Sequence, residues 1–172
     1  MLQPPKWQNL GGCFYLMAEI LIVCTANICR SPVGEALLRD RLQKRGLSHW
    51  TVKSAGTWAQ SKRGASTYSV KIMTEQGLDI TGHQAEMIKL SHMKQADLIL
   101  CMEAGHKEAL QAEFPLYAPK VYLLSEMVGQ NYSIRDPYGK SKDSYYRMVS
   151  ALSRIIDEGL DTIVEKAEAN AA

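Results

Sequence analysis

Residues 19–32 read EILIVCTANICRSP, and this stretch decides both the fold and the chemistry. Its apolar first part predicts a strand, and the amphipathic run after residue 32 predicts a helix. Cys24 and Arg30 therefore bracket a five-residue turn between the strand and the helix. The backbone N–H groups of such a turn, the helix N-terminus and the Arg30 guanidinium together suit a tetrahedral oxyanion. Because Cys24 can attack the central atom, the stretch predicts phosphoryl transfer to sulfur.

Cys24 is the expected nucleophile. A helix N-terminus and a neighbouring arginine both favour the thiolate form of a cysteine, which is the attacking species. Considered alone, Cys24 would be better explained as a small buried side chain at the end of a strand. Arg30 and Ser31, in the same strand-to-helix turn, favour the catalytic interpretation instead.

The composition predicts one ordinary globular domain, since the chain has 172 residues and a formal net charge of +2. This small charge, without basic runs between aromatics, argues against a nucleic-acid partner, and no apolar stretch reaches membrane-spanning length. The cysteine spacing fits no zinc site, so we expect no metal. Without a convincing secretion signal, we expect a cytoplasmic protein with reduced thiols. The cysteines are Cys13, Cys24, Cys29 and Cys101.

The chain divides into an N-terminal tail and one domain. Residues 1–16 contain prolines and glycines without periodicity, so we expect a disordered tail, with Met17 as a candidate start and the domain over residues 17–168. Strand-like segments (19–24, 50–54, 97–102, 120–124) alternate with helix-like ones (33–45, 67–76, 104–114, 144–167). This alternation predicts a three-layer α/β fold, with helices on both faces of a four-stranded parallel sheet. Ligands of such sheets bind outside the carboxyl ends of the strands, where Cys24 lies.

The late loop supplies a candidate general acid, which an ester needs for its leaving oxygen. It contains Asp136-Pro137-Tyr138, in which Pro137 extends the preceding backbone and Tyr138 can stack on an aromatic substrate. An ordinary Asp-Pro turn is the alternative. Because the loop follows the fourth strand, it should emerge on the same edge as Cys24, which favours Asp136 as the acid.

These motifs resemble those of the low-molecular-weight protein tyrosine phosphatases. The resemblance runs from about residue 18 to the end of the last helix. It includes Cys-x5-Arg-Ser-Pro at residues 24–32, Ser-Ala-Gly-Thr at 54–57, Gly-His at 82–83, Ala-Asp-Leu-Ile-Leu-Cys-Met at 96–102 and Asp-Pro-Tyr at 136–138. The family implies a hydrolase of phosphotyrosine that needs neither a metal nor another cofactor.

The resemblance also implies a mechanism. Cys24 attacks phosphorus to form a phosphocysteine, and Asp136 protonates the leaving tyrosine oxygen and then deprotonates the attacking water. Ser31 hydrogen-bonds the Cys24 thiolate, and Arg30 holds equatorial oxygens together with the loop amides. Those amides belong to Thr25, Ala26, Asn27, Ile28, Cys29 and Arg30.

Several supporting roles follow from the resemblance, each with a plainer alternative. Asn27 is expected to brace the loop in a network with Ser54 and His83, although His83 equally fits a solvated loop histidine. Trp58 is expected to form the opposite wall of the cleft, although it equally fits a partly buried surface aromatic. Cys29 matches a second loop cysteine that can form a disulfide with the nucleophile, the alternative being a small filler beneath the loop.

One residue departs from the family pattern, because Ala26 stands where the family usually has glycine. If this position required a positive φ angle, a Cβ there would cost on the order of 1 kcal/mol and distort the loop. If its conformation is ordinary, alanine is harmless, and we expect at most a mild impairment.

Three competing functions remain. The first is hydrolysis of phosphoarginine. Related phosphoarginine phosphatases typically carry threonine at the position of Ile28, and because isoleucine cannot hydrogen-bond a guanidinium, Ile28 favours an aromatic substrate instead. Arsenate reductases of this fold need two further cysteines after the second helix, and residues 78–96 contain none. The third is a recognition module that binds phosphotyrosine without hydrolysis.

The expected partner is a phosphotyrosine-containing protein, for which a tyrosine kinase is a candidate by family analogy. The sequence leaves the oligomeric state open.

Overall fold

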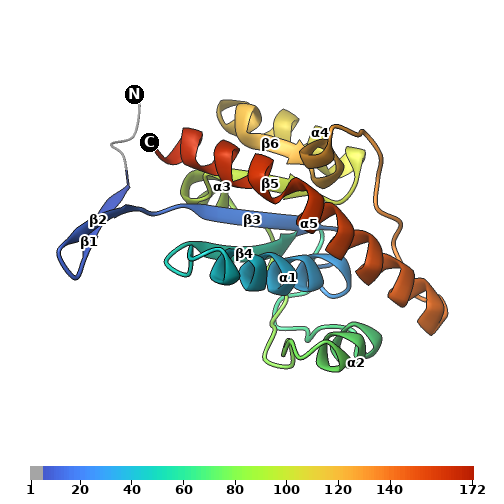
Figure 1. Ribbon diagram of the computed structural model, residues 1–172. Helices are drawn as coiled ribbons and strands as arrows, with labels where there is room; N and C mark the ends of the chain where they lie inside the picture. Colours follow the sequence, from blue (N-terminus) through green and yellow to red (C-terminus); the bar gives the residue numbers. More distant parts are fainter. Residues whose placement is uncertain (1–5) are drawn as a thin grey trace.

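The computed structural model describes residues 6–172. Its central element is a four-stranded parallel sheet in the order β4-β3-β5-β6 (Figure 1). The strands are β3 (Glu19–Cys24), β4 (Thr51–Gly56), β5 (Leu98–Cys101) and β6 (Val121–Leu123). In the register, Ile22 pairs with Ser54 on one side and with Leu100 on the other. The predicted four-stranded parallel sheet is confirmed.

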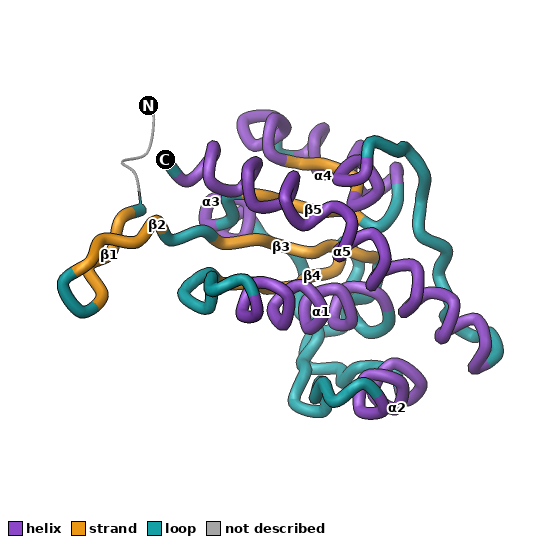
Figure 2. The backbone as a smooth tube through the Cα atoms, viewed as in Figure 1, coloured by secondary structure: helices purple, strands orange, loops and turns teal. Residues whose placement is uncertain are grey.

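Helices cover both faces of the sheet, as Figures 1 and 2 show. On one face lie α1 (Arg30–Lys44) and the long α5 (Lys142–Ala171), and on the other lie α3 (Leu90–Gln95) and α4 (Ala104–Glu113). Helix α2 (Thr67–Glu75) packs against α1 and α5, and 3-10 helices span Pro115–Lys120 and Leu124–Val128. The predicted three-layer α/β fold is confirmed.

Strand β3 is buried on both faces, which explains its unbroken apolar sequence. Ile20 and Ile22 belong to the core beneath α1 and α5, whereas Leu21 and Val23 belong to the core beneath α3 and α4. All four side chains have no exposed surface. A strand fixed in this way holds the residue that follows Val23 at a defined point of the carboxyl edge.

The N-terminal segment differs from the expected tail. Over residues 7–16 it forms an antiparallel hairpin of β1 (Trp7–Leu10) and β2 (Cys13–Leu16), so the prediction of disorder is wrong there; residues 1–5 lie outside the described part. Gly11 and Gly12, with φ angles of 63° and 93°, suit a two-residue hairpin loop. This Gly-Gly pair is the signal from which the hairpin could have been predicted.

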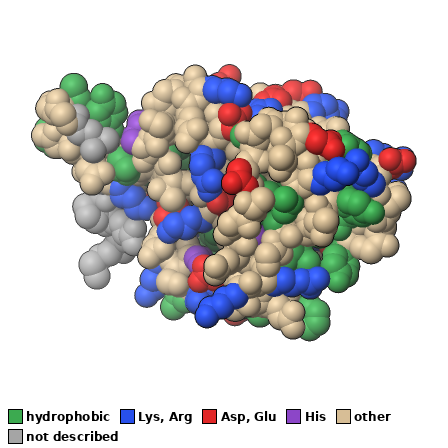
Figure 3. Space-filling model, turned by 90° about the horizontal axis from the view of Figure 1, so that it is seen from below, with side chains coloured by type: hydrophobic (Ala, Val, Ile, Leu, Met, Phe, Trp, Pro, Cys, Tyr) green, Lys and Arg blue, Asp and Glu red, His purple; other side chains and the backbone are tan. Residues whose placement is uncertain are grey.

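The hairpin projects from one end of the molecule, and hydrophobic side chains are visible there (Figure 3). Next to it, Lys6 anchors the segment to the domain. Its Nζ lies 2.8 Å from Oδ1 of Asp97, whose side chain is almost fully buried, and its backbone N–H donates to the carbonyl of Ala171. None of the helices in residues 6–172 is long and apolar enough to cross a membrane.

Candidate active site

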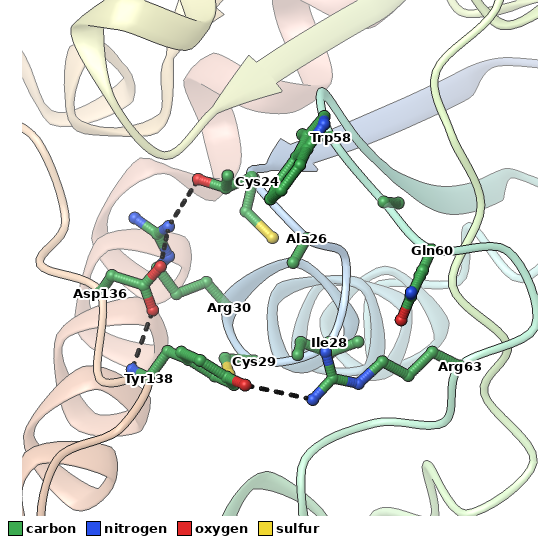
Figure 4. Close-up of a pocket in the computed structure, with 12 residues that line it drawn as sticks. Cys24, Ala26, Ile28, Cys29, Arg30, Trp58, Gln60, Arg63, Asp136 and Tyr138 are labelled. Atoms are coloured by element: carbon green, nitrogen blue, oxygen red, sulfur yellow. Dashed lines mark hydrogen bonds and ion pairs between the residues drawn. The ribbon is translucent and has the colours of Figure 1, made fainter.

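A cleft of about 480 Å³ opens at the carboxyl edge of the sheet, where the turn after β3 leads into α1 (Figure 4). The turn, the segment after β4 and the loop before α5 all contribute to it. The lining residues are Cys24, Thr25, Ala26, Ile28, Cys29, Arg30, Trp58, Ala59, Gln60, Arg63, Asp136 and Tyr138. Three segments far apart in the sequence therefore meet at the carboxyl edge of the sheet, where a ligand is expected from the parallel topology.

The Cys24 thiol lies at the base of this cleft and is almost fully buried. Its Sγ is 3.0 Å from Oγ of Ser31. The Ser31 oxygen accepts a hydrogen bond of 2.8 Å from Nδ2 of Asn27, which leaves the Ser31 proton available for the sulfur. A hydroxyl that donates to sulfur stabilises negative charge on it during the reaction.

Asn27 is the centre of the network that holds the turn. It is completely buried and has a φ angle of 54°, a left-handed conformation that asparagine tolerates better than most residues. Its Nδ2 also donates to Ser54 Oγ at 2.9 Å, and its Oδ1 accepts from the Glu86 N–H at 2.8 Å. Nε2 of His83 lies 2.7 Å from the Asn27 carbonyl oxygen. The structure thus brings together Asn27, Ser54 and His83, as the network requires.

The φ angle of Ala26 is not positive; in this turn it is Asn27 that has a positive φ angle. The Cβ of alanine is therefore compatible with the local backbone. Of the two conditions set out from the sequence, the harmless one applies to this structure.

Arg30 is 1 % exposed and is held by four groups around its guanidinium. Nη1 donates to the Ile134 carbonyl at 2.9 Å and to the Glu103 carboxylate. Nη2 donates to Asp136 Oδ2 at 2.7 Å and to Thr25 Oγ1 at 3.2 Å. Nε is buried without a hydrogen-bond partner among the described residues. A buried donor without a partner is costly, so this N–H marks a place for an acceptor oxygen.

Asp136 reaches the cleft from the loop before α5, on the side facing Cys24 (Figure 4). One carboxylate oxygen, Oδ2, pairs with Arg30, and the other, Oδ1, accepts a hydrogen bond of 3.0 Å from the Tyr138 N–H. The side chain is 39 % exposed and so has access to both the cleft and solvent. Its position fits proton exchange with an oxygen bound in the cleft.

The rim of the cleft is aromatic and exposed. Trp58 is 79 % exposed and Tyr138 is 57 % exposed, and both line the cleft. Arg63 joins them, since its guanidinium lies 5.7 Å from the Tyr138 ring centre and 3.3 Å from the phenolic oxygen. A flat ring entering the cleft would meet these side chains on its way to Cys24.

Cys29 also lines the cleft and is 3 % exposed. Its Sγ lies 3.5 Å from the hydroxyl of Tyr145. Burial raises the pKa of the Cys29 thiol, and burial together with Cys29 raises the pKa of Tyr145 to about 12. Cys29 is therefore held as the neutral thiol at neutral pH.

Glu103, His106 and Arg63 are among the site residues that were not predicted from the sequence. Glu103 follows the end of β5 and contacts Arg30, and His106 in α4 places Nε2 2.9 Å from Thr25 Oγ1. Burial lowers the pKa of His106, so the ring is neutral. The third is Arg63. The available signal for Glu103 and His106 was the strand order, because a polar residue after β5 must lie beside the turn that follows β3.

The comparisons with known proteins agree with this geometry. The family model described as "Low molecular weight phosphotyrosine protein phosphatase" matches residues 19–169. A probable low molecular weight protein-tyrosine-phosphatase, EpsP of Ralstonia nicotianae, is 37 % identical over 142 residues, covering 83 % of this chain and 93 % of that protein. The protein-arginine-phosphatase of Bacillus subtilis is 33 % identical over 139 residues, covering 80 % and 91 %.

The solved structures give the same result. The low molecular weight protein tyrosine phosphatase from T. tengcongensis superposes with a TM-score of 0.80 at 34 % identity, over 84 % of this chain and 99 % of that one. The family model's match over residues 19–169 includes the turn after β3 and the loop before α5. The chain therefore belongs to the low molecular weight phosphotyrosine protein phosphatase family.

Proposed function

We propose that this protein is a protein tyrosine phosphatase that hydrolyses phosphotyrosine through a phosphocysteine intermediate. One observation carries the proposal. The Cys24 sulfur, a buried arginine with an unpartnered N–H and the Asp136 carboxylate converge on one cleft at a strand-to-helix turn. Each group has the chemistry that one part of a phosphoryl transfer needs.

In the first step, the Cys24 thiolate attacks phosphorus and the bond from phosphorus to the tyrosine oxygen breaks. Asp136 gives its proton to that leaving oxygen. The backbone N–H groups of residues 25–30 and the Arg30 guanidinium hold the equatorial oxygens, and the unpartnered Nε is one of the donors available to them. Arg30 and the amides neutralise the charge, so this step needs no metal.

In the second step, Asp136 removes a proton from water, which attacks the phosphocysteine and releases inorganic phosphate. Cys24 leaves as the thiolate, which the Ser31 hydroxyl stabilises from 3.0 Å. Asn27, Ser54 and His83 keep the turn in its anion-binding conformation throughout both steps.

The cleft favours an aromatic substrate. Trp58 and Tyr138 offer flat apolar surfaces at the rim, and Ile28 lines the cleft with a side chain that cannot accept a hydrogen bond. One relative is a protein-arginine-phosphatase, so phosphoarginine is the substrate to compare. The expected partner is a phosphotyrosine-containing protein in the cytoplasm, with a tyrosine kinase as the first candidate.

The test is hydrolysis of p-nitrophenyl phosphate and of a phosphotyrosine peptide in the presence of a metal chelator. We expect activity in the wild type, no turnover for Cys24→Ser, and a loss of about 10²–10⁴-fold for Asp136→Asn with the peptide. Faster hydrolysis of phosphoarginine than of phosphotyrosine would contradict the substrate assignment. Peptide binding without turnover by the wild type would indicate a recognition module, and thiol-dependent turnover of arsenate would indicate a reductase.

A further inference from the structure

A second cavity of about 510 Å³ lies on the other side of the Asp136 loop. It is formed by residues 132–137, by Lys140 and by the first turns of α5. Asp136 lines both this cavity and the active-site cleft, so the two are separated by the thickness of one loop. The further lining residues from α5 are Ser144, Arg147, Met148 and Ala151.

This second cavity is basic. Arg135, Lys140 and Arg147 line it, and none of their side chains forms an ion pair or hydrogen bond with any residue in the described part of the chain. The single carboxylate in the lining is Asp136, which is already paired with Arg30. Three positive charges therefore face one hollow without compensation from the protein.

Some cations of this domain are paired with carboxylates. On α1, Arg41 pairs with Asp157 of α5, and Lys44 pairs with Asp40. At the second cavity the one lining carboxylate, Asp136, is paired with Arg30, which leaves positions that an anionic group could occupy.

We infer that the second cavity binds an anionic group of the substrate chain, a carboxylate or a second phosphate, a few residues from the phosphotyrosine in the cleft. The inference rests on the proposed function and specifies its substrate class. An extended peptide advances about 3.3 Å per residue, so two to four residues suffice to cross one loop. Arginine offers a planar fork that fits either anion.

The experiment compares kcat/KM for a series of phosphotyrosine peptides. The peptides are identical except at the positions two to four residues before and after the phosphotyrosine. One set has neutral residues there, a second has Asp and Glu, and a third has a second phosphotyrosine. We expect the acidic or doubly phosphorylated peptides to be preferred by about tenfold at low salt, since each exposed ion pair contributes a few-fold. The two anionic sets show which source of negative charge the cavity prefers.

Arg147→Glu is the decisive variant, and Arg154→Glu is its matched control. Both are exposed arginines of α5 without an ion pair in the described chain, but Arg154 does not line the cavity. We expect the preference to fall at least fivefold with Arg147→Glu, and to be retained with Arg154→Glu. Hydrolysis of p-nitrophenyl phosphate reports the chemistry of each variant separately. Equal preference in both variants, or none in the wild type, would overturn the inference.

Binding separates this result from the proposed function. Fluorescence anisotropy with the Cys24→Ser protein gives Kd for the same peptides without any turnover. Tighter binding of anionic peptides that is lost with Arg147→Glu would support the cavity even in a protein that hydrolyses nothing. Turnover of every peptide with identical Kd values would leave the phosphatase assignment intact and exclude the cavity as a substrate site.

Discussion

The turn over residues 24–31 and the rim of the cleft are built in opposite ways. In the turn, side chains such as Asn27 and Arg30 are buried, and each makes several hydrogen bonds. On the rim, Trp58 and Tyr138 are mostly exposed, and Arg63 reaches Tyr138 across open surface. The rigid turn can bind the phosphate that all substrates share, whereas contacts with the exposed rim can determine which phosphate-bearing group is preferred.

The largest predicted effect breaks the turn itself. Arg30→Lys keeps one positive charge but removes the planar fork and the Nε donor, so kcat/KM for p-nitrophenyl phosphate should fall by about 10³-fold or more. Circular dichroism and thermal unfolding would check that the variant is folded. A loss below tenfold in a folded protein would show that the guanidinium geometry is not required.

The next prediction disturbs the support beneath the turn. A Cβ on Gly56 would lie 2.5 Å from the Thr25 carbonyl oxygen, and a backbone atom cannot move away cheaply. Gly56→Ala should therefore lower the free energy of unfolding by about 1–3 kcal/mol and reduce kcat as well.

Gly64→Ala is the matched control, because a Cβ on Gly64 would meet no atom within 4 Å and its φ angle is not positive. We expect almost no change in either quantity. Chemical denaturation and steady-state kinetics measure both variants. Similar results for the two alanines would mean that the turn is less tightly supported than its contacts indicate.

On the rim, Trp58→Ala should act on binding alone. The side chain is 79 % exposed, so the free energy of unfolding should change by less than about 0.5 kcal/mol. KM for a phosphotyrosine peptide should rise by about 3–10-fold through the lost aromatic contact. A large fall in kcat with unchanged KM would place Trp58 in the chemistry instead.

The smallest effect distinguishes two cysteines within the turn. Because burial raises the pKa of Cys29, its reactive thiolate should form only above the ordinary cysteine value of about 8.5, so alkylation there should increase as the pH rises. At pH 7, iodoacetamide should modify Cys24 first, and phosphate should protect it.

The measurement is peptide mass mapping in a Cys13→Ser background, since Cys13 is exposed. Equal modification of Cys24 and Cys29 at pH 7 would contradict the assignment of a neutral Cys29 thiol. The role of Cys29 in reversible oxidation is a separate prediction, which the same mapping can test after peroxide treatment.

The sequence was informative where local pattern and topology act together. The apolar run over residues 19–23 predicted a strand, and the parallel topology then placed Asp136 at the same edge of the sheet as Cys24. It was less informative for Arg63, which reaches Tyr138 from an irregular segment whose path follows no periodicity. Glu103 was missed because its partner, Arg30, is 73 positions away and meets it only through the pairing of β3 with β5.

The ion pair between Lys6 and Asp97 links stability to the start of the chain. Asp97 is 4 % exposed, and its carboxylate also accepts a hydrogen bond of 2.8 Å from the Glu19 N–H. A polypeptide begun at Met17 would lack Lys6, and the loss of this partner for a buried carboxylate would cost on the order of 1–3 kcal/mol. Since Asp97 lies at the amino end of β5 and the cleft at the carboxyl end, catalysis would be unchanged. The segment before the domain would then contribute to how firmly the fold is held together and not to the rate of the reaction.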